Sequence, residues 1–361
     1  MSFKPSVHWL LAAIPVAAVL DGMSAPAPLV FFSAALAIVP LATLIVHGTE
    51  HLAVRTGPAV GGLLNATFGN LPELIIAFVA LRAGLLDMVR ASLVGALLAN
   101  LLLALGLGFF LGGLRYHEQT YNPAAARTYG SMMLLAALSM VVPATFHRFL
   151  GETAPRYAEA LDTGVALVLL TAYALYLVFM VRTHPEFFAG GGEEETTAEA
   201  HWSVGRAGAT LVIASLGAAW MSETLVGAAE ATGHAMGMSP LFIGIILLAV
   251  LGGAAESGSA IAMARANKMD LSVGIAMGSS IQIALFVTPV LVLASRVTGT
   301  ERLTLSFSRA EIFALFFGVM IGVLVTGDGR TNWFKGVQLL TFYLILAAMF
   351  YLIPFEAGVV R

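Results

Sequence analysis

Long apolar runs, separated by short polar or Gly/Pro-rich breaks, make up most of this 361-residue chain. A membrane-spanning helix needs about 20 mainly apolar residues, and most of these runs approach that length. The pattern predicts eleven transmembrane helices, near residues 8–21, 28–46, 59–81, 91–112, 128–147, 160–181, 206–230, 240–264, 271–294, 309–326 and 333–353. We therefore expect an all-α membrane protein.

The first apolar run resembles a secretory signal, because Lys4 precedes the apolar stretch from Trp9 to Leu20 and small residues follow it. Pro28 comes directly after the small-residue site at 25–27, and a proline in that place disfavours cleavage. We expect the run to be retained, so that residues 1–27 form an extra N-terminal transmembrane helix.

One long polar stretch, residues 182–201, interrupts the apolar pattern near the middle of the chain. Its run GGGEEE joins three glycines to Glu193, Glu194 and Glu195, a composition typical of a flexible, solvated linker. An alternative function for this run is a metal-capturing sensor. The predicted organisation is a first repeat at 28–182, an acidic linker at 183–204 and a second repeat at 205–361.

The two halves share polar and glycine residues at a constant separation of 183 positions. The matched pairs are Gly69 with Gly252, Glu73 with Glu256, Ala77 with Ala260, Arg82 with Arg265, Asp87 with Asp270 and Gly95 with Gly278. Apolar similarity between membrane helices is common, whereas matched Gly, Glu, Arg and Asp residues are informative. Five helices per repeat would invert the second copy in the membrane. The sequence therefore predicts two inverted five-helix repeats, as in many secondary transporters.

Charge and composition narrow the class of function further. The net charge of −3 does not suggest a nucleic-acid partner, and the absence of cysteine excludes disulfides, thiolate nucleophiles and iron–sulfur clusters. Ten of the 18 Lys and Arg residues fall on the N-terminal side of the predicted spans. This small excess favours a cytoplasmic N-terminus and a cytoplasmic acidic linker. We expect a multi-pass protein of a prokaryotic inner membrane, with the lipid bilayer as a partner.

Two carboxylates inside apolar runs are the candidate functional groups. An ionised carboxylate at membrane depth costs at least ~2.5–3.5 kcal/mol, so Glu73 and Glu256 need partners. Gly69 and Pro72 precede Glu73, and Gly252 and Gly253 precede Glu256, so each helix is expected to break beside its carboxylate. Carboxylates beside freed carbonyls form an oxygen-rich site, which hard cations such as Ca²⁺ require. Without a cation the two like charges repel, so the same groups should take up protons.

The segments that carry these acids resemble a known family. GGLLNATFGNLPELIIAFVALRAGLL and NKMDLSVGIAMGSSIQIALFVTPVLVL are similar to the two repeat signatures of Ca²⁺/H⁺ exchangers, within the calcium/cation antiporter superfamily. The first repeat keeps the family's Gly-Asn-x-x-Glu as Gly69, Asn70 and Glu73. The second reads GGAAES where the family has Gly-Asn-Ala-Ala-Glu-His, so Gly253 replaces the Asn and Ser257 the His.

The resemblance implies fold, activity and further site residues. It implies antiport by alternating access, with Glu73 and Glu256 binding either cation or protons, and with Ca²⁺ as the transported substrate and no cofactor. Asn100, Ser279 and Gln282, on the helices after the two breaks, are implied as ligands or supporting residues; interhelical hydrogen bonding is the simpler alternative. Glu50 and Glu230 match acids near the ends of two gating helices and would gate entry or relay protons.

Other functions stay open at this point. Because Gly253 and Ser257 depart from the family pattern, Na⁺/H⁺ or Mn²⁺/H⁺ exchange is the alternative within the antiporters. A cation channel is the alternative in another transport class, although an inverted pair within one chain favours alternating access. The run HGTEH, residues 47–51, fits a zinc-protease pattern, but it provides no third ligand and we expect no enzyme. The sequence makes no prediction of the oligomeric state.

Overall fold

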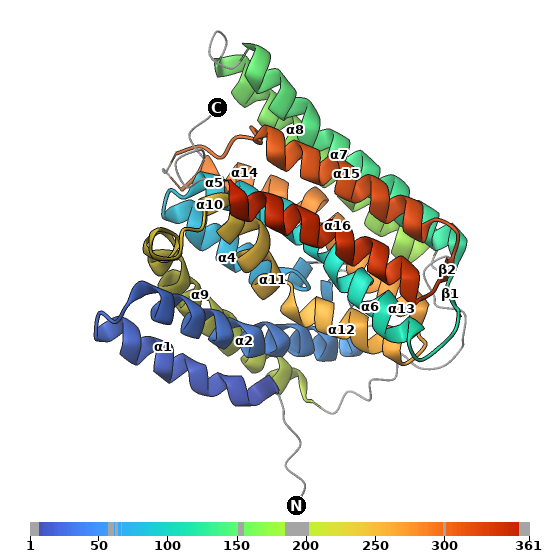
Figure 1. The fold of residues 1–361 in the computed structure, drawn as a ribbon, viewed down its shortest axis with the longest axis horizontal. Coiled ribbons are helices and arrows are strands. Elements are labelled where there is room, and N and C mark those ends of the chain that lie inside the picture. The colour runs from blue at the N-terminus through green and yellow to red at the C-terminus, as the bar shows by residue number, and fades with distance from the viewer. Residues whose placement is uncertain are drawn as a thin grey trace, which may run out of the picture.

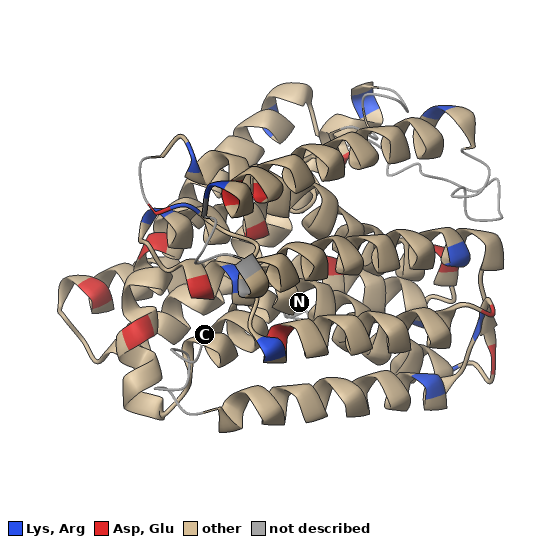
Figure 2. Ribbon diagram, turned by 90° about the horizontal axis from the view of Figure 1, so that it is seen from above, with Lys and Arg blue, Asp and Glu red and all other residues tan. Residues whose placement is uncertain are grey.

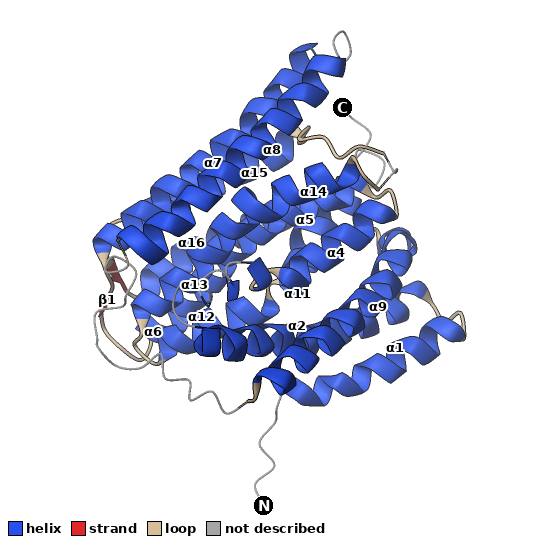
Figure 3. Cartoon of the chain, turned by 180° about the vertical axis from the view of Figure 1, so that it is seen from behind, coloured by secondary structure: helices blue, strands red, loops and turns tan. Residues whose placement is uncertain are grey.

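The computed structural model describes residues 7–56, 61, 64–65, 67–150, 155–184, 202–298 and 301–353. Nearly all of this is helical (Figure 3). The elements of the first half are η1 (Val7–Ala12), α1 (Ala13–Gly22), α2 (Ala27–Thr56), α4 (Leu71–Arg82), α5 (Leu86–Leu98), η2 (Ala99–Ala104), α6 (Leu105–Gly113), β1 (Gln119–Thr120), α7 (Pro123–Leu150), α8 (Pro155–Val178) and η3 (Phe179–Thr183).

The second half repeats the order of the long helices from α2 onward. Its elements are α9 (Val204–Met236), α10 (Pro240–Phe242), η5 (Ile243–Leu248), α11 (Ala249–Gly252), α12 (Ala254–Arg265), α13 (Met269–Gln282), η6 (Ile283–Val287), α14 (Thr288–Ser295), α15 (Arg309–Thr326), β2 (Arg330–Thr331) and α16 (Trp333–Leu352). The acidic stretch at 185–201, and with it most of the predicted linker, lies outside the described residues.

All eleven predicted spans fall on helices. Within the described ranges, eight helices are long and apolar enough to cross a membrane, and a ninth span is the pair 240–252 and 254–265, which bends by 60°. The N-terminal stretch Val7–Gly22 is shorter. The predicted span 59–81 corresponds to α4 and a few helical residues before it, and residues 57–60, 62, 63 and 66 lie outside the description.

Several predicted boundaries differ from the observed ones by five residues or more, and the C-terminal ends of α2 and α9 differ most. The helix expected at 28–46 continues as α2 to Thr56, and the one expected at 206–230 continues as α9 to Met236. The polar residues that follow 46 do not interrupt α2, and α9 ends only at Gly237, which has a left-handed conformation. The resulting long helices α2 and α9 pack against each other with α1 beside them (Figure 1).

Contacts between the halves occur in matched pairs. Helix α4 packs on α9 and its counterpart α12 packs on α2; α7 packs on α13 and α15 on α5; α8 packs on α14 and α16 on α6. Each half therefore uses the same surfaces towards the other. This pattern is expected of two inverted repeats, and it agrees with the fold class that the sequence predicts.

If each predicted span crosses the membrane, successive loops lie on alternate sides, and loops on the same side contact one another. On one side Gln119 donates to the carbonyl of Ala264 over 2.8 Å, and β1 pairs antiparallel with β2. This short ladder is the one exception, within the described residues, to the all-α prediction. On the other side Arg302 bonds to Glu159, and Arg296 donates to the Glu159 carbonyl over 2.8 Å. Charged residues are sparse along the helices between (Figure 2).

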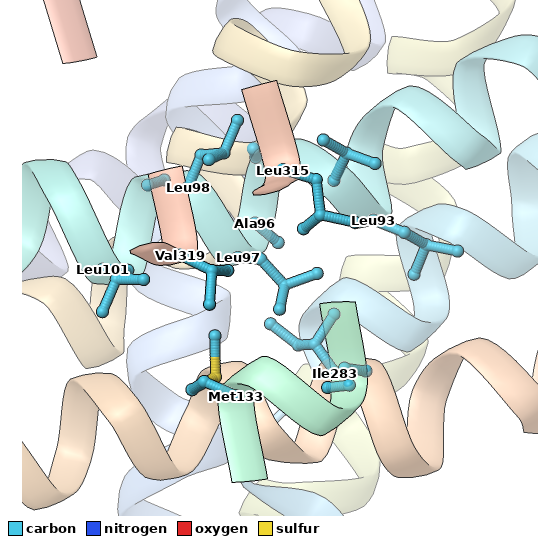
Figure 4. Packing of buried hydrophobic residues seen from close by; sticks show 14 of the residues in the cluster. Leu93, Ala96, Leu97, Leu98, Leu101, Met133, Ile283, Leu315 and Val319 are labelled. Carbon is cyan, nitrogen blue, oxygen red and sulfur yellow. The ribbon is translucent and has the colours of Figure 1, made fainter. Parts of the chain in front are cut away.

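Glycines allow the centre of the molecule to pack closely. A Cβ on Gly95 of α5 would lie only 2.5 Å from the Cα of Ile245 in η5, so no side chain fits at this crossing between the halves. Gly244 makes the reciprocal approach, where a Cβ would lie 3.0 Å from the Met88 carbonyl oxygen. Beside this crossing, leucines of α5 and η2 pack with Met133, Ile283 and residues of α15 in a buried cluster (Figure 4). The core thus surrounds the two helix breaks.

Candidate functional site

The first break lies between the helical residues 67–68 and α4. Asn70 is the N-cap of α4 with φ −97° and ψ 28°, outside helical geometry, and Pro72 occupies the first turn. A proline is tolerated in that turn because its missing N–H would have no intrahelical acceptor. Glu73 also lies in the first turn. Glu73 therefore lies at the positive end of the helix dipole.

The second break lies between α11 and α12. Gly253 occupies the N-cap place that Asn70 has in the first half, with φ −80° and ψ 13°, and Glu256 lies in the first turn of α12. Gly69 and Gly252 thus lie at the ends of the segments that precede the breaks, as the expected break beside each carboxylate requires. The last carbonyls of α11 are left without helical donors, so they are available as ligands.

Both carboxylates are buried and lie near each other. Glu73 and Glu256 are each 7% exposed, and all four of their carboxylate oxygens lack a hydrogen-bond partner among the described residues. The Glu73 side chain lies against the second break, where a Cβ on Gly252 would lie 3.2 Å from its Cγ, four residues before Glu256. Buried carboxylates without partners are costly, so the arrangement is complete only with a cation or protons between them.

Polar side chains from both halves form a hydrogen-bonded chain beside the carboxylates. Asn70 donates to the Gln282 amide oxygen and accepts from the Ser279 hydroxyl over 2.6 Å. Asn100 donates to the same hydroxyl over 3.0 Å, and its own amide oxygen has no hydrogen-bond partner among the residues that the structure describes. These hydrogen bonds fix the orientation of the Asn100 side chain. Its amide oxygen joins the four carboxylate oxygens as a fifth acceptor without a donor among the described residues.

That free oxygen points toward the second break. A Cβ built on Gly253 would lie 3.4 Å from Asn100 Oδ1 and 3.6 Å from Glu73 Oε1. A Cβ on Gly252 would lie 3.2 Å from the Glu73 Cγ, and one on Gly69 would lie 3.4 Å from Gln282 Oε1. The glycines therefore bring the backbone of each break against polar groups of the site.

Widened helical turns occur at matched places in the two halves. The π-helical segment η2 begins at Ala99, next to Asn100, and η6 begins directly after Gln282. Such turns insert an extra residue per turn and are frequent at functional sites. In η6 the Thr288 hydroxyl also donates to the Ile283 carbonyl over 2.8 Å, which stabilises the widened turn. Asn100 lies within η2 and Gln282 lies directly before η6, so the two polar residues occupy neighbouring, not identical, positions of the repeat.

The two outer acids lie farther from the chain of polar residues. Glu50 is exposed on α2, which packs against α12, the helix that carries Glu256. Glu230 is exposed on α9, which packs against α4, the helix that carries Glu73. Among the described residues, no hydrogen bond or ion pair joins either acid to the two buried carboxylates.

The donor set suits a cation that accepts varied oxygen ligands. Within the described residues no group of three or more His, Asp or Glu side chains comes together. Two carboxylates, the Asn100 amide oxygen and the helix-end carbonyls provide oxygen atoms only. Ca²⁺ takes six to eight oxygen ligands in flexible geometry, and two carboxylates neutralise its charge.

Sequence reasoning missed part of the wall beside Glu73. Ser92 and Ala96 of α5 and Ile283 of η6 line a cavity of about 10 Å³ next to that carboxylate, room for about one water molecule. Small side chains four residues apart on α5 were the available signal, but such spacing is common in membrane helices. The residues that were missed are uncharged, and they define the walls of the cavity.

Comparisons with known proteins agree with this architecture. The family model described as sodium/calcium exchanger protein matches residues 26–182 and 207–352. A Ca(2+)/H(+) antiporter of Synechocystis sp. is 40% identical over 340 residues, covering 90% of this chain and 91% of that protein. The Ca(2+)/H(+) antiporter ChaA of Bacillus subtilis is 38% identical, covering 95% of this chain and 97% of that protein.

Solved structures show the same likeness. Native YfkE, 36% identical, matches 96% of this chain and 100% of its own with a TM-score of 0.83. The H+/Ca2+ exchanger CAX, at 14% identity, matches 98% of this chain and 93% of its own with a TM-score of 0.69, which shows a shared fold.

Proposed function

The chain belongs to the sodium/calcium exchanger protein family, and we propose that it is a secondary antiporter that exchanges Ca²⁺ for H⁺ across a membrane by alternating access. The family resemblance and the fold class predicted from the sequence are confirmed. The observation that carries the proposal is the pair of buried carboxylates, one from each repeat, whose four oxygens have no hydrogen-bond partner in the part of the chain that the structure describes.

Competition for these oxygens couples the two ions. A Ca²⁺ ion would be held by Glu73 and Glu256, with Asn100 and the helix-end carbonyls completing the shell. When it leaves, repulsion between the carboxylates favours protonation of the site. Asn70, Ser279 and Gln282 would keep the Asn100 oxygen oriented, and Glu50 and Glu230 would act on entry or on proton transfer. A proton gradient then drives Ca²⁺ in the opposite direction.

Matched contacts between the halves support alternating access. Each broken helix rests on the long helix of the other half, α4 on α9 and α12 on α2. A displacement of α2 and α9 against the rest would therefore open one break while it covers the other. We also propose that the N-terminus and the acidic linker lie in the cytoplasm and that the membrane is the inner membrane of a prokaryote, with repeat boundaries near 28–182 and 205–361.

Flux measurements on reconstituted vesicles test the function. An imposed pH gradient should drive uphill Ca²⁺ accumulation, and collapse of that gradient with a protonophore should stop it. A cation channel lets Ca²⁺ move only down its own electrochemical gradient, so uphill accumulation separates the two classes. Ca²⁺ flux that ignores the pH gradient would overturn the antiport proposal.

Proton competition gives a further expected result. When the pH is lowered on the side from which Ca²⁺ binds, the KM for Ca²⁺ should rise while the maximal rate stays nearly constant, because protons and Ca²⁺ occupy the same carboxylate oxygens. The measurement is initial Ca²⁺ uptake over a series of external pH values with the internal pH clamped. A KM that does not change with external pH would contradict a shared site.

Cation selectivity is expected to depend on the second break. The double variant Gly253→Asn/Ser257→His should raise the ratio of Ca²⁺ transport to Na⁺ or Mn²⁺ transport several-fold, because it adds fixed ligands near Glu256. The new Cβ at 253 would lie 3.6 Å from Glu73 Oε1, an ordinary contact, although it would crowd the Ala249 carbonyl at 3.3 Å. Parallel flux assays at equal cation concentrations and one pH gradient measure the ratio.

The variant Gly253→Ala is the matched control, since it adds the Cβ without the amide. An unchanged ratio in the double variant would show that the backbone carbonyls at residues 252 and 253 already complete the shell. In that case Gly253 and Ser257 would not determine which cation is transported.

A further inference from the structure

A groove on the outside of the molecule lies apart from the candidate cation site. It runs between α7 and α8, has a volume of about 490 Å³, and is lined by Leu138, Ser139, Val142, Ala160, Leu161, Gly164, Val165, Val168 and Leu169. Ser139 is the one lining residue with a polar side chain, and its hydroxyl donates to the Leu135 carbonyl over 2.8 Å. The groove therefore presents an apolar surface.

The position of the groove places it in the hydrocarbon phase of a bilayer. Both helices are long and apolar enough to cross a membrane. Only 22% of the apolar stretch of the helix at 156–183 is buried, so most of this helix lies at the surface of the protein. The outward residues Leu138, Val142 and Val168 are exposed. What fills the groove in a membrane must come from lipid or from another protein.

The groove is elongated along α8. Its floor contains Ala160 and Gly164, and a Cβ on Gly164 would meet no atom within 4 Å. From Ala160 to Leu169 the helix rises about 14 Å, so an extended acyl chain can lie along the groove.

A cation marks the end of the groove. Arg156 precedes Ala160 and Gly164 by four and eight residues, so these three residues share one face of α8. The nearby Arg302 and Arg296 both contact Glu159. Arg156 is exposed and has no acidic partner among the residues that the structure describes. Exposed Tyr157 next to it is typical of the membrane–water interface.

From these observations we propose that the α7–α8 groove binds one acyl chain of an anionic glycerophospholipid whose phosphate contacts Arg156. The apolar lining holds the chain, and the guanidinium provides charge complementarity at the depth where a headgroup lies. The groove is a lipid site that is separate from the path of the cation.

Native mass spectrometry of the detergent-purified, delipidated protein tests the proposal. Phosphatidylglycerol and phosphatidylcholine of equal chain length are titrated separately, and the tightest binding event is quantified. Phosphatidylglycerol should bind more tightly. Gly164→Leu should remove this event for both lipids, and Arg156→Gln should reduce the preference for phosphatidylglycerol about fivefold while phosphatidylcholine still binds.

Gly208→Leu is the matched control, because a Cβ on Gly208 of α9 also meets no atom within 4 Å. It should bind both lipids as the native protein does. Native-like binding by Gly164→Leu would overturn the proposal, as would equal binding of the two lipids by the native protein. Loss of an oligomer, instead of a lipid, in Gly164→Leu would show that a second copy occupies the groove. Bound lipid is measured without transport, so this test is independent of the proposed exchange.

Discussion

Replacing either Glu73 or Glu256 with Gln is expected to abolish coupled exchange, with a fall of about 100-fold in pH-driven Ca²⁺ uptake. Gln keeps the volume of the side chain but supplies neither the negative charge for Ca²⁺ nor the exchangeable proton. Loss of a charged ligand worth about 3 kcal/mol corresponds to a factor of that size. The measurement is Ca²⁺ uptake into vesicles that contain equal amounts of each folded protein.

Both variants are expected to fold, because the carboxylate oxygens make no hydrogen bond to any described residue and Gln removes a buried charge. Glu118→Gln is a suitable control, since Glu118 is exposed and pairs with Arg330 over 3.3 Å, away from the site. If either Glu73→Gln or Glu256→Gln retains more than about half of the native flux, the paired site is not the exchange site.

The second large effect is expected at the crossing of α5 and η5. Gly95→Val should prevent the native packing of the two halves, because the Cβ alone would lie 2.5 Å from the Ile245 Cα and backbone cannot give way as a flexible side chain does. Overpacking in a core costs about 1–3 kcal/mol where side chains can adjust, and here the expected cost exceeds that range. The loss of stability is measured by thermal unfolding in detergent, with the decrease of the monodisperse gel-filtration peak as the signal.

Gly227→Val provides the comparison for that experiment. Gly227 lies on an exposed face of α9, and a Cβ there meets no atom within 4 Å. It should unfold within a few degrees of the native protein. A Gly95→Val protein that is as stable as Gly227→Val would mean that the two halves do not cross as closely as described.

The sequence predicted the breaks better than the helix ends. Gly69 and Gly252 are matched across the repeat, and both breaks occur directly after them, beside Glu73 and Glu256. Glycine and proline act on the local backbone, so their effects can be inferred from neighbours in the chain. The ends of α2 and α9 depend on packing against each other, and packing allowed both helices to continue through polar residues that the sequence reading took as boundaries.

Contacts between the halves could not be predicted from a single sequence. Asn100, Ser279 and Gln282 were singled out through the family resemblance, but nothing in their spacing shows that Asn70 bonds to both Gln282 and Ser279. Likewise, the π-helical turns next to Asn100 and Gln282 have no periodicity of their own, because each inserts one residue into an ordinary apolar run. Such features arise from tertiary contacts and leave little local signal.

The matched contacts between the halves also bear on how such a protein could arise. Since α4 packs on α9 and α12 on α2, a five-helix chain paired with an upside-down copy of itself would meet the same surfaces. A half-length ancestor would therefore have had to insert into the membrane in both directions. A chain with a strong positive-inside bias inserts in one direction only. Gene duplication and fusion, with a helix added at the N-terminus, would then have fixed the two orientations within one polypeptide. Such an origin would leave Lys and Arg divided almost equally between the two sides of the membrane, as in the ten-to-eight division counted from the sequence.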